Sequence, residues 1–204
     1  LKRSDIKREA AKIINEELTV DDSLFLYHDV CTNGIGYVDL MFKTDSIAPE
    51  QIPYLGLLKS VLGYVDTENY TYGELFNEIN ANTGGINWGV EVFDRADSTE
   101  KFQAMFSVRG KALYTKMDFL FKMIGEILNS SKLEDTKRLY EIVASVKSRA
   151  QVNLTGAGHS TAVLRAAAYS SPMAAFQDEM AGIGYYQFIE KLEKDFEQRK
   201  EETV

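Results

Sequence analysis

Residues 53–86 restrict the possible folds of this chain more than any other segment. An apolar helical pattern over 53–65 is followed by a polar turn and by a second helical pattern over 71–82. Gly84 and Gly85 then permit a tight exit from the second helix, and a strand-like run follows them. The segment therefore predicts two consecutive helices that lead directly into a strand.

The other predicted elements come in blocks on either side of this segment. Strand-like runs cover 24–30, 35–42, 86–94 and 101–109. Helical patterns cover 112–130, 134–152, 159–169, a stretch after Pro172, and 185–200. Blocks of strands and helices, without strict alternation, indicate an α+β fold with an antiparallel sheet and helices packed on one face. We find no second core and no internal repeat, so residues 1–204 are predicted to form a single domain.

Each predicted strand has one apolar and one mixed face, as an antiparallel sheet covered on one side requires. Asp39, Glu91 and Arg109 fall on mixed faces, where the simplest interpretation is that they face solvent. Between the first two strands, Asn33-Gly34 is a strong signal for a hairpin turn. The sequence therefore predicts that 24–30 and 35–42 pair with each other.

Charge and composition limit the possible partners. The formal net charge is −8 and no basic stripe is visible, so we expect no nucleic-acid partner. No apolar run approaches the roughly 20 residues that span a bilayer, and no signal peptide is recognisable, so we expect no membrane partner. The single Cys31 excludes an internal disulfide and fits a reducing compartment, so we expect a cytoplasmic protein.

Candidate metal ligands do not form a recognisable group. His28 and His159 are the only imidazoles, and a zinc site would need both of them together with carboxylates such as Asp29 or Glu134. Zinc ligands usually lie at short spacing on one element, as in the HxxEH motif, and neither histidine has such a neighbour. We therefore predict no metal-binding, cofactor-binding or catalytic residue in this chain.

Candidate nucleophiles also lack partners in the sequence. Cys31 follows His28 by three residues, but on a strand that spacing directs the two side chains to opposite faces. Ser160 follows His159 without an acidic partner or a nucleophile elbow. The pair Gly84-Gly85 leaves a helix, whereas phosphate-binding loops lead into a helix N-terminus.

Short motifs follow one another in a fixed order along most of the chain. They are Thr32-Asn33-Gly34-Ile35 with Tyr37, residues 55–64, Tyr72 with Glu74-Leu75, Thr83-Gly84-Gly85-Ile86, Gly110-Lys111-Ala112-Leu113, Gly158-His159 with Ala162 and Arg165-Ala166, and Gly182 with Tyr185-Tyr186 and Phe188. In this order and spacing they resemble the pitrilysin-type (M16) zinc metallopeptidases of the presequence-protease-like branch, which is subfamily C. The chain is similar to the third of the four domains in that branch, the region associated with the subfamily C peptidases.

The resemblance implies a domain fold of the mitochondrial-processing-peptidase type and a role that does not include catalysis. In the catalytic domains of the family, the helix that matches residues 53–65 carries the HxxEH motif. Here the motif positions hold Leu57, Leu58, Lys59, Ser60 and Val61, so no zinc ligand or general base remains. The chain is thus expected to be a non-catalytic, chamber-forming domain of a zinc metalloendopeptidase that degrades peptides. Zinc is expected only in the catalytic domain of the parent enzyme.

The resemblance also implies partners. They are the other domains of the same polypeptide and, in the full enzyme, a peptide substrate. Asp39, Glu91 and Arg109 would then line the chamber wall. The alternative is a stand-alone protein-interaction or scaffold module on the same fold.

The first residues allow two interpretations. Ser4-Asp5-Ile6, followed by charged and small residues, is typical of a capped polar helix, whereas the resemblance implies an extended leading segment or linker over 1–20, which we favour. The chain begins with Leu1 and ends in a charged helical tail, so we expect it to be a piece of a longer polypeptide.

Overall fold

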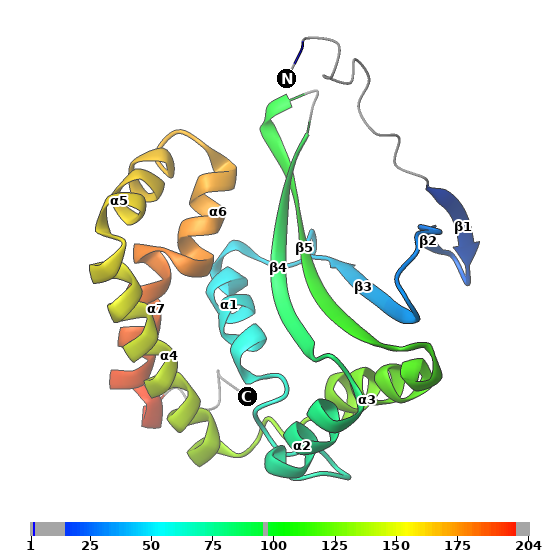
Figure 1. The fold of residues 1–204 in the computed structure, drawn as a ribbon. Helices are drawn as coiled ribbons and strands as arrows, with labels where there is room; N and C mark the ends of the chain where they lie inside the picture. The colour runs from blue at the N-terminus through cyan, green and yellow to red at the C-terminus, as the bar shows by residue number, and fades with distance from the viewer. Residues whose placement is uncertain (1, 3–14, 96–97, 199–204) are drawn as a thin grey trace. The chain divides into compact units, whose positions relative to one another are not determined.

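The structure is a computed structural model that describes residues 2, 15–95 and 98–198. Two compact units make up the chain, Leu1–Ile35 and Gly36–Val204, and each is considered by itself. Figure 1 follows the chain from its N-terminus in blue to its C-terminus in red.

The first unit contains an antiparallel hairpin. Strand β1 (Glu16–Val20) pairs with β2 (Ser23–Tyr27) through a turn at Asp21 and Asp22. The φ angles of these two aspartates are 46° and 65°. Positive φ at both central residues is the geometry of a type I′ turn, whose twist matches that of the flanking strands. The extended interpretation of the leading segment therefore applies to residues 16–20; residues 1 and 3–14 lie outside the described part.

The predicted pairing of 24–30 with 35–42 is wrong. Asn33 and Gly34 do turn the chain, with φ of 53° and 85°. However, β2 pairs with β1, and β3 (Ile35–Lys43) belongs to a different sheet. A turn signal fixes the local direction of the backbone only, and the choice of a strand's partner depends on contacts elsewhere.

The second unit is built on a three-stranded sheet with the order β3-β5-β4 (Figure 1). Strands β4 (Ile86–Arg95) and β5 (Ser98–Leu113) form an antiparallel pair, in which Trp88 lies opposite Val108. One face of this sheet carries Trp88, Val108 and other apolar residues that pack into the core. The expected α+β class, with an antiparallel sheet and helices packed against it, is confirmed.

Two helices lie between β3 and β4 in the chain. After a short 3-10 turn (η2, Pro49–Gln51), α1 (Ile52–Val61) ends four residues earlier than the predicted 53–65. Helix α2 (Tyr72–Asn82) begins after Thr71, whose hydroxyl accepts a hydrogen bond from the Glu74 amide, while the Glu74 carboxylate accepts one from the Thr71 amide. This reciprocal capping box satisfies two amides that would otherwise lack partners.

The predicted helix over 112–130 begins too early. Strand β5 continues to Leu113, a 3-10 turn (η3, Tyr114–Lys116) follows, and α3 covers Met117–Ser130. The described chain continues with α4 (Thr136–Gly156), α5 (Gly158–Ala167), α6 (Pro172–Ala181) and α7 (Ile183–Lys194). Between α4 and α5 the helical run is interrupted only at Ala157, because α4 extends beyond the predicted 134–152.

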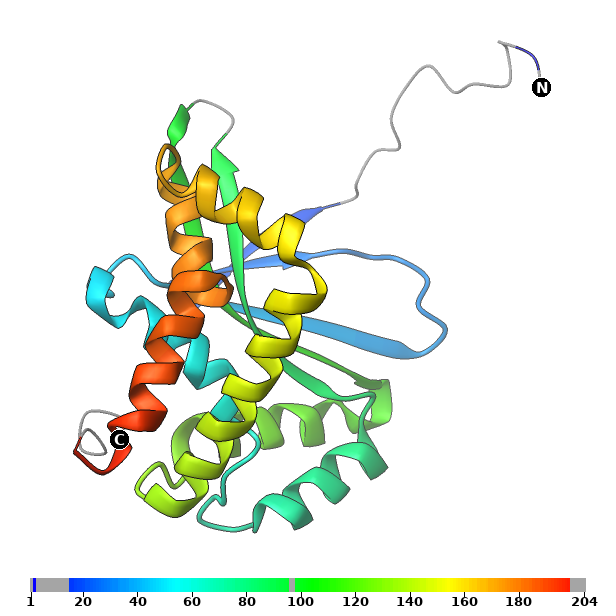
Figure 2. The same ribbon diagram turned by 90° about the vertical axis from the view of Figure 1, so that its left-hand side faces the viewer.

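Helix α1 lies between two clusters of buried apolar residues. Its Leu55 and Leu62, the residue that caps its end, contribute to a cluster with the sheet, α3 and α6. Its Leu57 and Val61 contribute to a second cluster with α4 and α7. Figure 2 looks onto the layer formed by α4 to α7, with α1 and the sheet behind it. The buried side chains of the second unit therefore lie on both sides of α1, which the periodicity of the sequence did not indicate.

None of the helices within the described ranges is both long enough and apolar enough to cross a membrane.

Candidate functional site

Helix α1 covers most of residues 53–65, the segment for which the resemblance implies a match to the metal-binding helix of the catalytic domains. At its motif positions, Leu57 and Val61 are buried against α4 and α7. Leu58 packs against the sheet-side cluster, and burial lowers the pKa of the Lys59 ammonium. These side chains therefore serve the packing of α1 between two layers, which a solvated metal ligand could not do.

The α1 helix also fits closely against α6 and α7. A Cβ atom at Gly56 would lie 2.8 Å from Cε2 of Tyr185 on α7 and 3.0 Å from the carbonyl oxygen of Met180 on α6. Tyr185 is buried among the residues of the second cluster, and this burial raises the pKa of its hydroxyl. Gly56 is therefore required for the close approach of these helices.

The candidate catalytic and metal-binding residues stand on separate elements. His28 falls within the predicted strand 24–30 but follows the observed strand β2, which ends at Tyr27. The argument about strand faces therefore does not apply to His28 and Cys31. Cys31 is exposed, and its Sγ lies 3.7 Å from Oδ1 of Asn33. His159 and Ser160 lie in the first turn of α5. Among the residues that the structure describes, no three His, Cys, Asp or Glu side chains are grouped so that they could hold a metal ion.

The three charged residues of the mixed sheet faces do come together. Arg109 Nε donates a hydrogen bond to Asp39 Oδ2 over 2.8 Å, and its Nη1 lies 3.1 Å from Glu91 Oε1. One residue comes from each strand of the sheet, with Arg109 on the central β5. We call this group the Arg109 cluster. The hydrogen bond to Asp39 is the main cause that raises the pKa of Arg109, and all three side chains remain partly exposed.

Small residues make room for the Arg109 cluster. Gly89 on β4 lies opposite Ser107 on β5, between the levels of Arg109 and Glu91. Ser107 is only 2% exposed although it lies on the face of the sheet opposite the core, so neighbouring side chains cover it. Glu91 Oε1 lies 3.9 Å from the Cβ position of Gly89. The Glu91 side chain therefore reaches the level of Ser107, where it meets Arg109.

A second group of charged residues lies where α5, α6 and α7 meet. Asp178 on α6 is 1% exposed. Its Oδ1 accepts a hydrogen bond from the Ile183 amide over 3.0 Å, and its Oδ2 accepts one from the Gly184 amide over 3.1 Å. Arg165 Nη1 donates to the same Oδ2 over 2.6 Å. The carboxylate of one helix thus caps the N-terminus of the next, where a negative charge is favoured. We call this group the Asp178 corner.

Two glycines are needed at the Asp178 corner. A Cβ atom on Gly182 would overlap Asp178 Oδ1 and lie 2.9 Å from its Cα, and one on Gly184 would lie 2.6 Å from Glu179 Oε1. Each glycine lies at the junction of two helices and also leaves space for a carboxylate. Both glycines therefore do more than interrupt the helical run.

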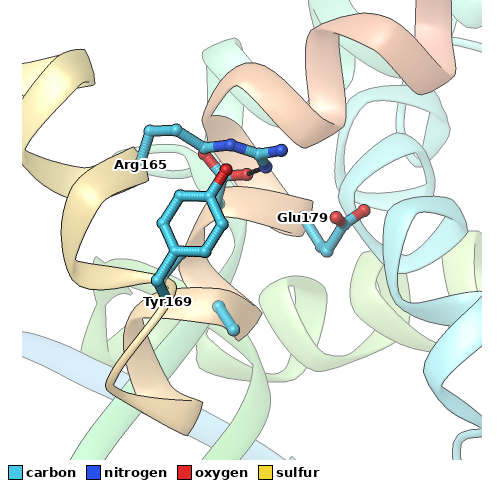
Figure 3. A pocket seen from close by; sticks show the side chains of 6 residues that line it. Arg165, Tyr169 and Glu179 are labelled. Atoms are coloured by element: carbon cyan, nitrogen blue, oxygen red, sulfur yellow. Dashed lines mark hydrogen bonds and ion pairs between the residues drawn. The ribbon is translucent and has the colours of Figure 1, made fainter.

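Arg165 reaches the corner along the wall of a shallow pocket (Figure 3). Its guanidinium carbon lies 5.7 Å from the centre of the Tyr169 ring, while Glu179 points away on the other side. The hydrogen bond to Asp178 is the main cause that raises the pKa of Arg165. Because the pocket is lined by one arginine and two carboxylates, it offers no net positive charge for an anion.

The comparisons with known proteins identify the relatives of this chain. A family model, described as the region associated with M16 peptidases of subfamily C, matches residues 1–192. The chain belongs to this peptidase-associated family. It is 35% identical to "Protein HypA" of Clostridium perfringens over 96% of its length, and 28% identical to the mitochondrial presequence protease of Yarrowia lipolytica over 98%. A chloroplastic and mitochondrial presequence protease of Arabidopsis thaliana is 28% identical over 95% of the chain.

The chain spans only about a fifth of the length of these relatives, 20% of the first two and 18% of the third. The family match, over residues 1–192, is to the peptidase-associated region of the M16 subfamily C type. The expected resemblance to the presequence-protease-like branch is confirmed.

Two motifs that carried this resemblance meet at the Asp178 corner. Arg165 and Gly182 belong to those motifs, and both contact Asp178, which sequence reasoning did not single out. The spacing of Asp178 from the two glycines was a usable signal, because a carboxylate just before a helix start can act as its cap. Which arginine pairs with it could be known only from the packing of α5 on α6.

Proposed function

We propose that this chain is the non-catalytic, chamber-forming domain of a zinc metalloendopeptidase that degrades peptides. The main support comes from α1, because its motif positions hold Leu57 and Val61, which are buried in the second cluster with α4 and α7. A helix that uses these positions for packing presents no ligand for zinc and no base for water. The domain would act by enclosing and positioning a substrate, which lowers the entropic cost of the reaction carried out elsewhere.

The relatives support a peptidase context for this proposal. Two of them are named presequence proteases, and the chain spans 20% of one and 18% of the other. Zinc would then be held by another domain of the same polypeptide. That domain would also supply the general base.

The mixed face of the sheet supports the assignment of a chamber wall. The Arg109 cluster lies on the face of the sheet that does not carry the core residues, and Tyr37 and Phe93 are exposed in the same strands. The cluster joins one arginine to two carboxylates, and these paired, partly exposed charges are expected to select only weakly among peptides, because water competes for each contact. Such a surface fits an enclosure better than a specific binding site.

Metal analysis of the purified chain tests this proposal directly. We expect well below one zinc per chain and no peptide cleavage, because α1 offers no ligand set. Stoichiometric zinc that is lost in the His28→Ala or His159→Ala variant would overturn the proposal. So would cleavage that survives chelation and disappears in Ser160→Ala or Cys31→Ala.

A chimera tests the positive part of the proposal. In it, the chain replaces the matching segment of the Yarrowia lipolytica presequence protease. We expect peptide cleavage by the chimera and none by the same protease without that segment. A chimera that folds cooperatively and binds zinc but cleaves nothing would favour the scaffold alternative.

A further inference from the structure

Helix α3 carries more apolar residues than its packing in this chain uses. The sequence places Leu120, Phe121, Ile124 and Leu128 on one apolar stripe. In the structure Leu120 and Ile124 are buried in the sheet-side cluster, whereas Phe121 and Leu128 are 48% and 39% exposed. The stripe is therefore divided into a buried inner part and an exposed outer part.

The exposed part has a regular spacing. Tyr114, which is 60% exposed in the turn before α3, precedes Phe121 by seven residues, and Leu128 follows Phe121 by seven. Gly125 lies between Phe121 and Leu128, and a Cβ atom there would come no closer than 4.0 Å to a neighbour, Asn129 Nδ2. We call Tyr114, Phe121, Gly125 and Leu128 the outer stripe. A glycine between two large side chains leaves room for a side chain of a neighbouring helix.

Within α3, Phe121 and Leu128 are seven residues apart, the spacing by which one helix packs along another, and Tyr114 lies in the 3-10 turn that precedes the helix. The outer stripe is bordered by Asp118 and Lys122, which are exposed and of opposite charge. A polar border of mixed sign beside an apolar seam is typical of helix–helix contacts. An isolated apolar residue on a protein surface needs no explanation, but a seam of this kind does.

We propose that the outer stripe is the docking surface for an amphipathic helix from another domain of the same full-length polypeptide. The proposal rests on the proposed function and adds the surface by which this domain meets its neighbours. The family model matches residues 1–192, so the outer stripe lies within the matched residues. The chain covers 20% of Protein HypA, and the remainder of such a protein is long enough to supply the helix.

The test compares two proteins that carry the same substitutions. One is the chain alone, and the other is a chimera in which the chain replaces the matching segment of Clostridium perfringens HypA. Phe121→Glu and Leu128→Glu are introduced together, and thermal unfolding is followed by circular dichroism. We expect the unfolding midpoint of the chimera to fall by at least about 5 °C, and that of the chain alone to change by less than about 2 °C.

Phe76→Glu is the matched control. Phe76 is 60% exposed on α2, but the residues seven positions before and after it are Asn69 and Thr83, so it belongs to no apolar seam of this spacing. We expect it to leave the midpoints of both proteins unchanged. The same pair of substitutions at the aligned positions of full-length HypA repeats the measurement without a chimera.

Three outcomes would overturn the proposal. Equal losses in the chain alone and in the chimera would mean that the outer stripe is used within this chain. No loss in either the chimera or HypA would mean that nothing docks there. A dimer of the chain alone in analytical ultracentrifugation, dissolved by the two substitutions, would assign the stripe to a second copy. None of these readouts depends on peptide cleavage, so the proposed function can fail independently.

Discussion

The Arg109 cluster and the Asp178 corner use the same chemistry in opposite surroundings. Each joins one arginine to a carboxylate over a hydrogen-bond distance, 2.8 Å to Asp39 and 2.6 Å to Asp178. On the sheet, all the charged groups remain partly exposed, and water can replace any of their contacts. At the corner, the carboxylate is buried and also holds two backbone amides at the start of α7.

The Arg109 cluster is thus part of a solvent-exposed surface, whereas the Asp178 corner is a buried contact between helices. An exposed ion pair gains little over its solvated partners, whereas a buried carboxylate loses its solvation and depends on every donor around it. The Asp178 corner should therefore determine how α5, α6 and α7 are held together. The Arg109 cluster should be almost neutral for folding, which leaves it available for contact with other molecules.

The largest effect is expected from Asp178→Asn. The amide retains the shape but directs an NH2 group or a weaker acceptor at the Ile183 and Gly184 amides, and it removes the buried counter-ion of Arg165. We expect a loss of about 3 kcal/mol in the free energy of unfolding, measured by urea denaturation. Asp94→Asn, at an exposed position near the end of β4, is the control and should change little. Equal midpoints for the two variants would contradict the structural role of the corner.

A smaller loss is expected from Gly182→Ala. The added methyl would overlap Asp178 Oδ1 and lie 2.9 Å from its Cα, so the backbone of α6 or α7 must move. We expect a destabilisation of about 1–3 kcal/mol, measured by the same urea denaturation. Gly156→Ala provides the comparison, because nothing lies within 4 Å of its Cβ position at the end of α4. That variant should be as stable as the parent or more stable by up to about 1 kcal/mol. The reverse order of the two would mean that space at the corner is not limiting.

The smallest effect is expected from Arg109→Gln. Its carboxylate partners are partly exposed, so water replaces the lost contacts. We expect the thermal midpoint of the chain to change by less than about 2 °C, and the difference to shrink further in about 0.5 M salt. In the presequence protease chimera, the same variant should alter the KM for peptides more than kcat. A large, salt-independent loss of stability would remove the contrast between the two clusters.

Local and distant interactions differ in how well the sequence predicted them. Thr71 and Glu74 form the expected capping box, because both partners of that interaction lie within one turn. Asn33-Gly34 turned the chain as expected but did not create the expected hairpin, because β2 pairs with a strand that the sequence pattern left ambiguous. Turn chemistry is local, whereas the pairing of strands is settled by competition among all of them.

The charged residues show the same limit. Alternation along the strands placed Asp39, Glu91 and Arg109 on mixed faces, and the structure brings these three together. The alternation pattern could not predict that Arg109 would lie on the central strand and reach both carboxylates. The order of strands in a sheet cannot be inferred from the sequence of any one strand. Only its spacing from Gly182 and Gly184 could have marked Asp178, since a buried carboxylate and an exposed one look alike in a helical sequence.

The sequence by itself determined the α+β class, most of the helices, the alternation of the strands and the family, because each depends on short-range periodicity or on ordered motifs. Tertiary structure alone decided which strands pair, how buried side chains divide on the two sides of α1, and which part of the α3 stripe is buried. It also decided that Asp178 caps the start of α7. Those outcomes depend on contacts between segments that are distant in the chain, whose free energies are set by the whole packed arrangement.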